Sequence, residues 1–578
     1  MNRNRLAYRF GPRLEEEITR FRIWSPDAEV ALEIEDRAPL SMRATGNGWR
    51  EAFATAGPGT RYRFRIGDVA VPDPASRMQS SDVHDWSVIV DPDSYSWRSA
   101  DWRGRPWEET VLYELHPGLM GGFAGIGRTL PRLAELGITA IELMPIGDFP
   151  GDRNWGYDGV LPFAPDRAYG TPDELKGLVD AAHDLGLMVF LDVVYNHFGP
   201  DGNFLPIYAK DFFRKDVKTP WGEAIDFRAP EVRRFFIENA LYWLHEFRID
   251  GLRFDAVHAI AGTDFLVEMA AELRASIAAD RHLHLVVEND NNEAALLQSG
   301  FDAQWNDDIH HVLHALLTGE SEGYYADYSE RPADGLARAL SQGFIYQGEA
   351  SAYRGGEKRG TPSAHLPPTA FVTFLQNHDQ TGNRALGERL RTLVSARALQ
   401  AAIALVLLSP QIPLLFMGEE AGAEEPFLYF TDHRDPTLAE AVREGRRSEF
   451  EKFSEFADEQ RRAAIPDPNA PETFETSRPR FESTDSEQWH GLYRRLLRLR
   501  RELVIPRLKH SKAETARAVG DAAVVARWRM GDGARLTLAC NLATAAAAAP
   551  LPRVPPVWGE VTGDAIPPAT TLLWIEAP

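Results

Sequence analysis

Between residues 111 and 418 the sequence repeats one pattern, in which a short and continuously apolar run precedes a longer segment with helical spacing. Runs that are apolar at every position are typical of parallel strands covered by helices on both faces. Eight such strands, with helices between them, predict a closed (β/α)8 barrel, which is an α/β fold. The predicted strands are Val111–His116, Thr139–Pro145, Met188–Val194, Ile249–Asp255, His284–Glu288, Phe301–Trp305, Phe371–Asp379 and Pro413–Gly418.

One connecting helix can be predicted in detail. Thr171 and Glu174 form a capping box, and Pro172 stands at the first helical position, where its missing N–H costs nothing. Gly186 is placed to end the helix. The predicted apolar stripe consists of Leu175, Leu178, Val179, Ala182 and Leu185.

Both ends of the chain instead alternate apolar and polar residues with a period of two, as antiparallel strands with one buried face do. Residues 1–95 are predicted to form a β-sandwich, residues 96–508 the barrel with insertions, and residues 509–578 a C-terminal antiparallel β-domain. The alternating runs are Phe21–Ile23, Val30–Ile34, Tyr62–Ile66, Val524–Val525 and Leu536–Leu538, and the turns are Gly46–Gly48, Gly57–Gly59 and Gly531–Gly533. Two further stretches, Phe198–Phe227 and Pro426–Arg480, fit no βα unit, and we expect them over the barrel mouth.

Charge and apolar run lengths exclude several classes of partner. The 63 basic and 85 acidic residues give a net charge of −22 without a basic tract, so we expect no nucleic acid partner. The longest apolar run, Ala401–Leu408, is far shorter than the roughly 20 residues of a membrane span, and Met1–Phe21 has no apolar core of a secretory signal. We therefore expect no membrane partner and a cytoplasmic location. The single cysteine, Cys540, is predicted to be a buried strand residue that forms no intramolecular disulfide.

Polar side chains follow four of the predicted strands, at the end of a barrel that carries the active site. Strand three ends in Asp192–His197, strand four in Gly251–Asp255 followed by His258, strand five in Glu288, and strand seven in Gln376–Asp379. A single aspartate at a strand end is more often a helix cap or turn residue. Three carboxylates converging on one mouth exceed what folding requires, because an unpaired carboxylate beside apolar strands is costly.

These residue types suit the hydrolysis of a glycosidic bond, in which one carboxylate is the nucleophile and another is the acid/base. Arg253 lies two residues from Asp255 on the same strand face and would keep that carboxylate ionised. Val286 and Val287 would help to keep Glu288 protonated. A metal site built from the same histidines and aspartates is the alternative, but no spacing resembles His-Glu-x-x-His, so we expect neither a metal nor a cofactor.

The four strand-end segments resemble the signature regions of the α-amylase superfamily, glycoside hydrolase family 13. The resemblance implies Asp255 as nucleophile, Glu288 as acid/base and Asp379 as transition-state stabiliser, with retention of the anomeric configuration. It also implies an immunoglobulin-like, carbohydrate-binding-module-like N-terminal sandwich and a C-terminal β-domain. The implied sugar contacts are Tyr157, His197, Arg253, His258 and His378.

Within that superfamily the flanking sequence is similar to the maltooligosyltrehalose trehalohydrolases. Gln380, after the third carboxylate, fits that group, whereas glycogen branching enzymes usually place Glu there. The segments that carry this similarity are Trp155–Val160, Asn196–Asn203, Trp221–Glu223, Glu288–Asp290, Trp305–His311, His378–Arg384 and Phe416–Glu420. One departure is the glycine-rich stretch Pro117–Gly127 after strand one, which could change the preferred glucan length.

The similarity implies cleavage of the α-1,4 bond beside the terminal trehalose unit of maltooligosyltrehalose, with release of trehalose, after a maltooligosyltrehalose synthase has acted. Expected aromatic contacts are Trp155, Tyr157, Trp221 and Trp305, and expected trehalose-side contacts are Asp307, Asp308, Gln380, Asn383 and Arg384. Two alternatives stay open. One is a glucan branching or other α-glucan-acting enzyme of the superfamily, and the other is a noncatalytic glucan-binding protein.

Overall fold

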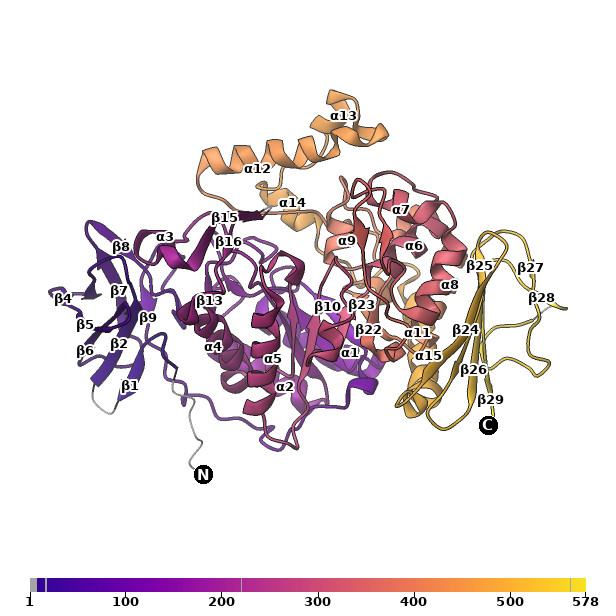
Figure 1. Ribbon diagram of the computed structural model, residues 1–578, viewed down its shortest axis with the longest axis horizontal. Helices are drawn as coiled ribbons and strands as arrows, with labels where there is room; N and C mark the ends of the chain where they lie inside the picture. Colours follow the sequence, from indigo (N-terminus) through magenta and orange to yellow (C-terminus); the bar gives the residue numbers. More distant parts are fainter. Residues whose placement is uncertain (1–7, 16–17, 220, 562) are drawn as a thin grey trace.

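A closed parallel barrel forms the centre of the computed structural model, which describes residues 8–15, 18–219, 221–561 and 563–578 (Figure 1). Its strands follow one another around the barrel in chain order, and the last pairs with the first. They are β10 (Leu112–Leu115), β11 (Ala140–Leu143), β14 (Met188–Val193), β17 (Gly251–Phe254), β18 (His284–Val287), β19 (Ala303–Trp305), β22 (Phe371–Thr373) and β23 (Ile412–Phe416). The predicted (β/α)8 barrel is confirmed strand by strand.

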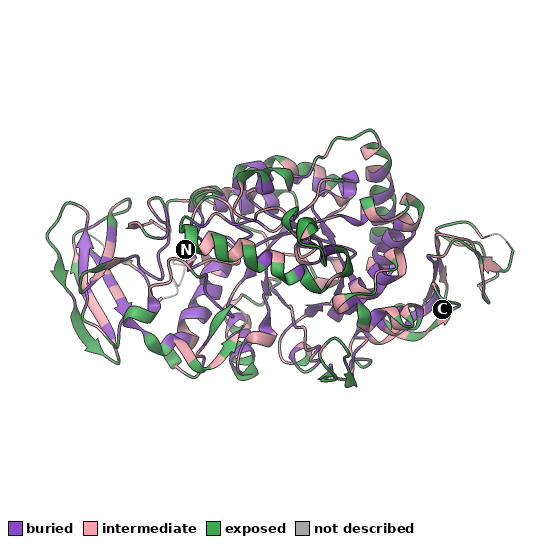
Figure 2. Cartoon of the chain, turned by 90° about the horizontal axis from the view of Figure 1, so that it is seen from above, coloured by how far each residue is buried: buried purple, intermediate pink, exposed green. Residues whose placement is uncertain are grey.

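Every residue of these strands is buried, as their continuous apolar character predicts. Neighbouring barrel strands pair in parallel. Glu114 pairs with Glu142, and Leu112 pairs with Leu414 where the barrel closes. Figure 2 shows the buried residues concentrated in the barrel and the exposed residues on the outer faces of the helices. The surrounding helices are α1 (Gly122–Leu136), α2 (Pro172–Asp184), α4 (Pro230–Glu246), α5 (Thr263–Ser276), α6 (Asp307–Thr318), α8 (Pro332–Gln342), α11 (Ala396–Leu408) and α15 (Ser486–Leu499).

Helix α2 has the predicted capping box. The Thr171 hydroxyl accepts from the Glu174 backbone N–H at 3.2 Å, and the Glu174 carboxylate accepts from the Thr171 backbone N–H at 2.7 Å. The apolar stripe is buried except at Leu185, which is 42% exposed, so its assignment to the stripe was wrong. Leu185 is the C-cap residue, beyond the last helical turn, and Gly186 follows with a left-handed φ of +75°.

The N-terminal unit contains two antiparallel sheets, as predicted. One has the order β1-β2-β6-β5 and the other β4-β3-β7-β8, with β9 paired to β7. Phe10 joins this unit to the barrel, because its N–H donates to the Glu238 carboxylate of α4 at 3.2 Å and its ring meets that of Phe235. The strands are β1 (Arg13–Glu15), β2 (Ile18–Trp24), β3 (Ala31–Ile34), β4 (Leu40–Ser41), β5 (Arg43–Gly46), β6 (Trp49–Ala54), β7 (Arg61–Ile66), β8 (Val69–Val71) and β9 (Ser87–Val88).

The C-terminal unit lies at the other end of an elongated molecule and is a sheet of order β24-β25-β26-β29 (Figure 1). The predicted hairpin turn at Gly531–Gly533 joins β25 to β26, and Thr571 of β29 donates to the Ala401 carbonyl of α11 at 2.6 Å. Cys540 is buried in β26. The strands are β24 (Lys512–Val519), β25 (Ala523–Arg529), β26 (Arg535–Asn541), β27 (Ala547–Ala548), β28 (Ala565–Ile566) and β29 (Thr570–Glu576). The boundaries 1–95, 96–508 and 509–578 stay a prediction.

The two predicted insertions have their own secondary structure. Residues 198–227 hold α3 (Leu205–Tyr208) and the paired strands β15 (Phe213–Thr219) and β16 (Gly222–Ile225). Residues 426–480 hold α12 (Pro436–Glu449), α13 (Glu459–Ala463) and α14 (Pro471–Thr476), and α12 and α13 lie above the barrel in Figure 1. Smaller elements around the barrel are β12 (Gly147–Asp148), β13 (Leu161–Pro165), α7 (Ala326–Ser329), β20 (Glu349–Ala350), β21 (Lys358–Arg359), α9 (His378–Gly382) and α10 (Leu390–Leu393).

None of the helices in the described part of the chain is both long and apolar enough to cross a membrane. Residues 1–7, part of the stretch inspected for a secretory signal, lie outside the described residues.

Candidate active site

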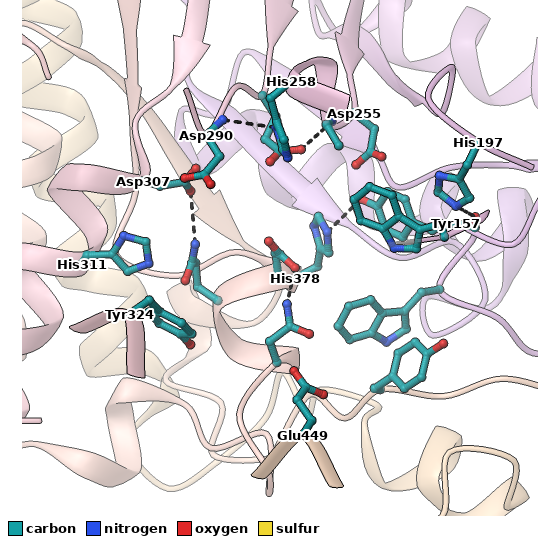
Figure 3. A pocket seen from close by; sticks show the side chains of 18 of the residues that line it. Tyr157, His197, Asp255, His258, Asp290, Asp307, His311, Tyr324, His378 and Glu449 are labelled. Carbon is teal, nitrogen blue, oxygen red and sulfur yellow. Dashed lines mark hydrogen bonds between the residues drawn. The ribbon is translucent and has the colours of Figure 1, made fainter. Parts of the chain in front are cut away.

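A cavity of about 850 Å³ lies at the carboxyl ends of the barrel strands and contains the three predicted carboxyl groups (Figure 3). Asp255 and Glu288 directly follow β17 and β18, so the barrel itself aims both side chains at the mouth. Asp379 is different, since β22 ends at Thr373 and Asp379 lies in the short helix α9. The predicted strand Phe371–Asp379 was therefore too long.

The guanidinium of Arg253 is the centre of the site's charge network. Its Nη1 donates to Asp192 at 2.6 Å and to Asp255 at 2.8 Å, and its Nη2 donates to Glu288 at 3.2 Å. The side chain is 2% exposed and lies over the Trp305 ring at 4.3 Å. One buried cation thus holds both Asp255 and Glu288 in fixed positions.

Glu288 has the environment of a proton donor. Its Oε2 accepts from the Ala256 backbone N–H at 2.6 Å, where Ala256 takes a left-handed φ of +39°. Burial is the largest influence and raises the pKa of Glu288 well above its ordinary value. Arg253 opposes that rise, and the negative charges of Asp255, Asp307 and Asp379 add to it.

Asp255 is held by donors on two sides. The Asn196 side-chain amide donates to its Oδ2 at 2.6 Å, and Arg253 donates to Oδ1. Asp379 accepts from the side-chain amide of Asn383, the C-cap residue of α9. Asn377 caps α9 by accepting from the Gln380 N–H at 2.7 Å, which fixes the direction in which Asp379 and Gln380 point. Donors from within the chain therefore orient both carboxylates before any substrate arrives.

The aromatic wall of the cavity consists of Trp155, Tyr157, His197 and Trp221. The Trp221 ring is 47% exposed and stacks on His197 at 5.0 Å and 16°. Trp155 is buried and donates its ring N–H to the Leu428 carbonyl at 2.9 Å. Trp221 is consequently the open stacking surface of this wall, and Trp155 is its buried support.

The polar wall consists of Asp290, Asp307, His311, Tyr324 and Gln380, and Figure 3 shows its four labelled members across His378 from Tyr157 and His197. The Gln380 amide donates to Asp307 at 3.1 Å. Burial, together with the charges of Asp379 and Asp290, raises the pKa of Asp307 to about 7. This wall therefore offers acceptors and donors in place of apolar surface. His258 lines the cavity nearby, and its Nδ1 accepts from the Asp290 N–H at 3.3 Å.

The cavity lining includes most, but not all, of the predicted binding residues. It contains Trp155, Tyr157, His197, Trp221, Arg253, His258, Asp307, His378, Gln380 and Asn383. Asp308 lies one residue further along α6, is fully buried, and accepts from Tyr328 at 2.6 Å and from Asn292 at 2.9 Å. It supports the fold and does not line the cavity, so its prediction as a contact was wrong.

Two more predicted contacts lie outside the cavity. Arg384 donates to Glu320 with both terminal nitrogens, at 2.8 and 3.0 Å, and does not line the cavity. Trp305 is buried beneath Arg253. The stretch Pro117–Gly127, described in full, contributes no lining residue either, because it folds into the start of α1 and buries Leu119. The cavity lining therefore gives no support to the expected effect of this stretch on the preferred glucan length.

Sequence reasoning did not find the segment from Tyr324 to Arg359, which supplies a large part of the cavity lining. Its contributions are Tyr324, Asp327, Tyr328, Ser351, Tyr353, Arg354 and Arg359. Arg354 and Arg359 both pair with Asp290, at 2.9 Å for Arg359. The segment has no repeated motif, but its tyrosines at 324, 325, 328, 346 and 353 are a compositional signal that could have identified it.

Helix α12 also reaches the cavity, through Arg446 and Glu449. The Arg446 Nη2 donates to the carbonyls of Gly382 at 2.7 Å and Arg384 at 2.9 Å. The insertion at 426–480 is thus tied to the helix α9 that carries Asp379, which places it over the mouth, as predicted.

A closed parallel barrel whose mouth joins three carboxyl groups, one buried arginine and an aromatic wall defines a glycoside hydrolase of the α-amylase class. A family model described as the alpha amylase catalytic domain matches residues 76–218, and one described as a domain of unknown function, DUF3459, matches residues 511–574.

Individual relatives narrow the assignment. A malto-oligosyltrehalose trehalohydrolase from Deinococcus radiodurans is 41% identical, over 84% of this chain and 81% of its own length. One from Saccharolobus solfataricus is 39% identical, over 85% and 87%. A crystal structure of a Salmonella typhimurium protein assigned as an α-amylase is 42% identical, covers 99% of this chain and 100% of its own, and has a TM-score of 0.92. The chain belongs to the malto-oligosyltrehalose trehalohydrolase family.

Proposed function

We propose that the protein is a retaining glycoside hydrolase that cleaves the α-1,4-glucosidic bond beside the terminal trehalose unit of maltooligosyltrehalose and releases trehalose. The observation that carries this proposal is the position of Glu288 and Asp255 on one guanidinium, between the aromatic wall and the polar wall. The similarity to named trehalohydrolases over more than four fifths of the chain supports the choice of substrate.

In the proposed mechanism, Asp255 attacks the anomeric carbon and forms a glycosyl-enzyme ester, while Glu288 protonates the departing oxygen. Glu288, now ionised, then deprotonates the water that cleaves the ester, so the two inversions give net retention. Binding to one guanidinium supports the short separation, roughly 5–5.5 Å, that a retaining pair needs. The raised pKa of Glu288 supports its role as acid, and Asp379 would bind hydroxyls of the distorted sugar.

The polar wall supports trehalose as the leaving group. The leaving group lies on the side of the acid, and the charge of Asp307 acts on Glu288. Gln380 donates to Asp307, and Asp290 and Asp307 lie across His378 from Tyr157 and His197 (Figure 3). Trehalose joins two glucoses through both anomeric carbons, so it presents hydroxyl groups in every direction and lacks a reducing end. A wall of fixed polar groups can discriminate such a unit from an ordinary glucan end. A ligand that lacks a hydroxyl at the expected place leaves buried polar groups of the wall without a hydrogen-bond partner.

A glucan branching enzyme would use the same carboxylates but pass the glycosyl group to the 6-hydroxyl of another glucan instead of water. A noncatalytic glucan-binding protein is the weaker alternative, because binding needs no acid/base pair. We place the enzyme after a maltooligosyltrehalose synthase, whose product has the required end. The cytoplasmic location stays a prediction.

The test is product analysis on maltooligosyltrehalose and on a plain maltooligosaccharide of equal length. We expect rapid release of trehalose from the first and little cleavage of the second. New branched products, or equal cleavage of both substrates, would refute the trehalohydrolase assignment. The Asp255→Asn variant is the matched control, because any activity that it retains comes from a contaminant or another site.

A further inference from the structure

A buried carboxylate with no role in the mechanism above lies next to the cavity-lining His378. Glu114 lies on β10, the first barrel strand, and is 1% exposed. Both of its oxygens face one residue: Oε2 accepts from the His378 backbone N–H at 2.9 Å, and Oε1 is hydrogen-bonded to Nδ1 of the His378 ring. The carboxylate therefore holds both the backbone and the ring of His378.

The hydrogens of this network can be assigned from its donors and acceptors. The Tyr157 hydroxyl has one hydrogen, and it donates that hydrogen to Asp192 at 2.7 Å. Its oxygen lies 2.8 Å from Nε2 of His378, so Nε2 must be the donor in that contact. Nδ1 faces a carboxylate and must also be a donor. A histidine that donates from both ring nitrogens is an imidazolium.

The surroundings of the ring favour a cation. It stacks on Tyr157 at 5.1 Å and 26°, and the rings of Trp155 and Trp305 lie 5.6 and 6.1 Å away. Aromatic faces attract cations, and more strongly where water is excluded.

The charges around His378 act in both directions. Burial is the largest influence and would lower its pKa, and Arg253 on β17 also opposes a charge; the nearby His116, whose pKa burial lowers to about 4, is neutral. Glu114 on β10 and Asp379 on α9 raise it, and the net pKa is raised above the ordinary value. Asp192 on β14 accepts from Tyr157 and also interacts directly with the charge of His378.

We propose that His378 is an imidazolium in the working enzyme and that Glu114 is its counter-ion and positioning residue. Only the predicted effect on kcat rests on the proposed function, because the protonation state of His378 is measured without substrate. Glu114 holds the ring edge-on to its carboxylate, which keeps Nε2–H directed at Tyr157 and fixes the Tyr157 ring in the aromatic wall. The positive charge also lies near the Asp379 carboxylate.

The protonation state can be measured without substrate. In full-length protein labelled with ¹⁵N-histidine, the His378 signals are assigned by their loss in the His378→Asn variant. We expect both ring nitrogens of His378 to show imidazolium shifts at pH 7, and Glu114→Gln to convert the ring to a neutral form. A neutral His378 in the wild-type protein would overturn the proposal, whatever the substrate proves to be.

Glu142→Gln is the matched control. Glu142 pairs in register with Glu114 on the neighbouring strand, and burial raises its pKa well above the ordinary value, which favours the neutral acid. An amide is close to a neutral acid in charge and shape, so the His378 signals should not change. If Glu142→Gln altered them as much as Glu114→Gln, the effect would come from the barrel interior in general, and Glu114 would lose its assigned role.

Kinetics then test the positioning role. Loss of one charged hydrogen bond predicts a fall in kcat of about ten- to a hundredfold for Glu114→Gln, with a smaller change in KM. Glu114→Asp, which keeps the charge, should recover part of that loss. An equal loss in Glu114→Asp and Glu114→Gln with normal His378 protonation would indicate a merely structural carboxylate and refute the proposal.

Discussion

Asp307 gives the sharpest test of the electrostatics at the cleavage site. Its carboxyl lies in the polar wall and has a pKa of about 7, and its negative charge is one of the influences that raise the pKa of Glu288. As the pH rises through 7, Asp307 becomes an anion and holds the proton on Glu288 more tightly. The Asp307→Asn variant removes this charge, so Glu288 should lose its proton at a lower pH.

The size of the effect follows from Coulomb's law. Two carboxylates roughly 7 Å apart repel each other by about 2 kcal/mol at an effective dielectric constant of about 20. Near neutral pH Asp307 is only partly ionised, so about half of that energy applies, which is roughly 0.7 pH unit. The basic limb of the profile of kcat/KM against pH should move toward acid by about this amount.

The assay is trehalose release from maltooligosyltrehalose between pH 5 and 9. Asp158→Asn is the matched control, because Asp158 lines the same cavity and is not among the main influences on the pKa of Glu288. Its basic limb should stay in place. A uniform loss of kcat/KM in Asp307→Asn with an unmoved limb would refute the electrostatic coupling and leave Asp307 only as a hydrogen-bonding group.

Three further outcomes are expected. Asp255→Asn should lower turnover by about 10⁴-fold or more while calorimetry still detects substrate binding, and near-normal turnover would exclude Asp255 as the nucleophile. Trp221→Ala should raise KM by about two- to twelvefold with kcat nearly unchanged, since an aromatic stacking contact contributes about 0.5–1.5 kcal/mol; an unaltered KM would remove Trp221 from the glucan path. Thr171→Ala should lower the free energy of unfolding by about 1 kcal/mol in urea titrations without affecting kcat, and a stability equal to wild type would mean that the capping box contributes nothing.

The barrel could be predicted because its strands are apolar on both faces, a pattern that depends little on distant contacts. The end of the seventh strand could not. The predicted run continued to Asp379, but β22 ends at Thr373 and Asn377 caps α9, and a cap that follows an apolar stretch looks like any other polar residue.

The direction of individual side chains is the other feature that could not be predicted from the sequence. Asp307 and Asp308 are adjacent acids at the start of α6, and the helix turns about 100° between them. One faces the cavity and the other accepts from Tyr328 in the interior, a difference that only the packing of α6 decides. The predicted substrate contact at Arg384 does not match its place in the structure for a similar reason, because its partner Glu320 lies 64 residues away in the sequence. The lining segment from Tyr324 to Arg359 is loop and short helix, where hydrophobic periodicity carries no information.

The two walls of the cavity are encoded by different parts of the chain. All four members of the aromatic wall lie between residues 155 and 221, whereas Asp290, Asp307, His311 and Tyr324 of the polar wall lie between residues 290 and 324. Most of the polar wall can therefore change by exchange of one contiguous block of sequence, without altering the nucleophile or the aromatic wall, and Gln380 is the one member of that wall outside the block. Recombination between superfamily members at the ends of that block would be a direct route to new specificities on an unchanged barrel.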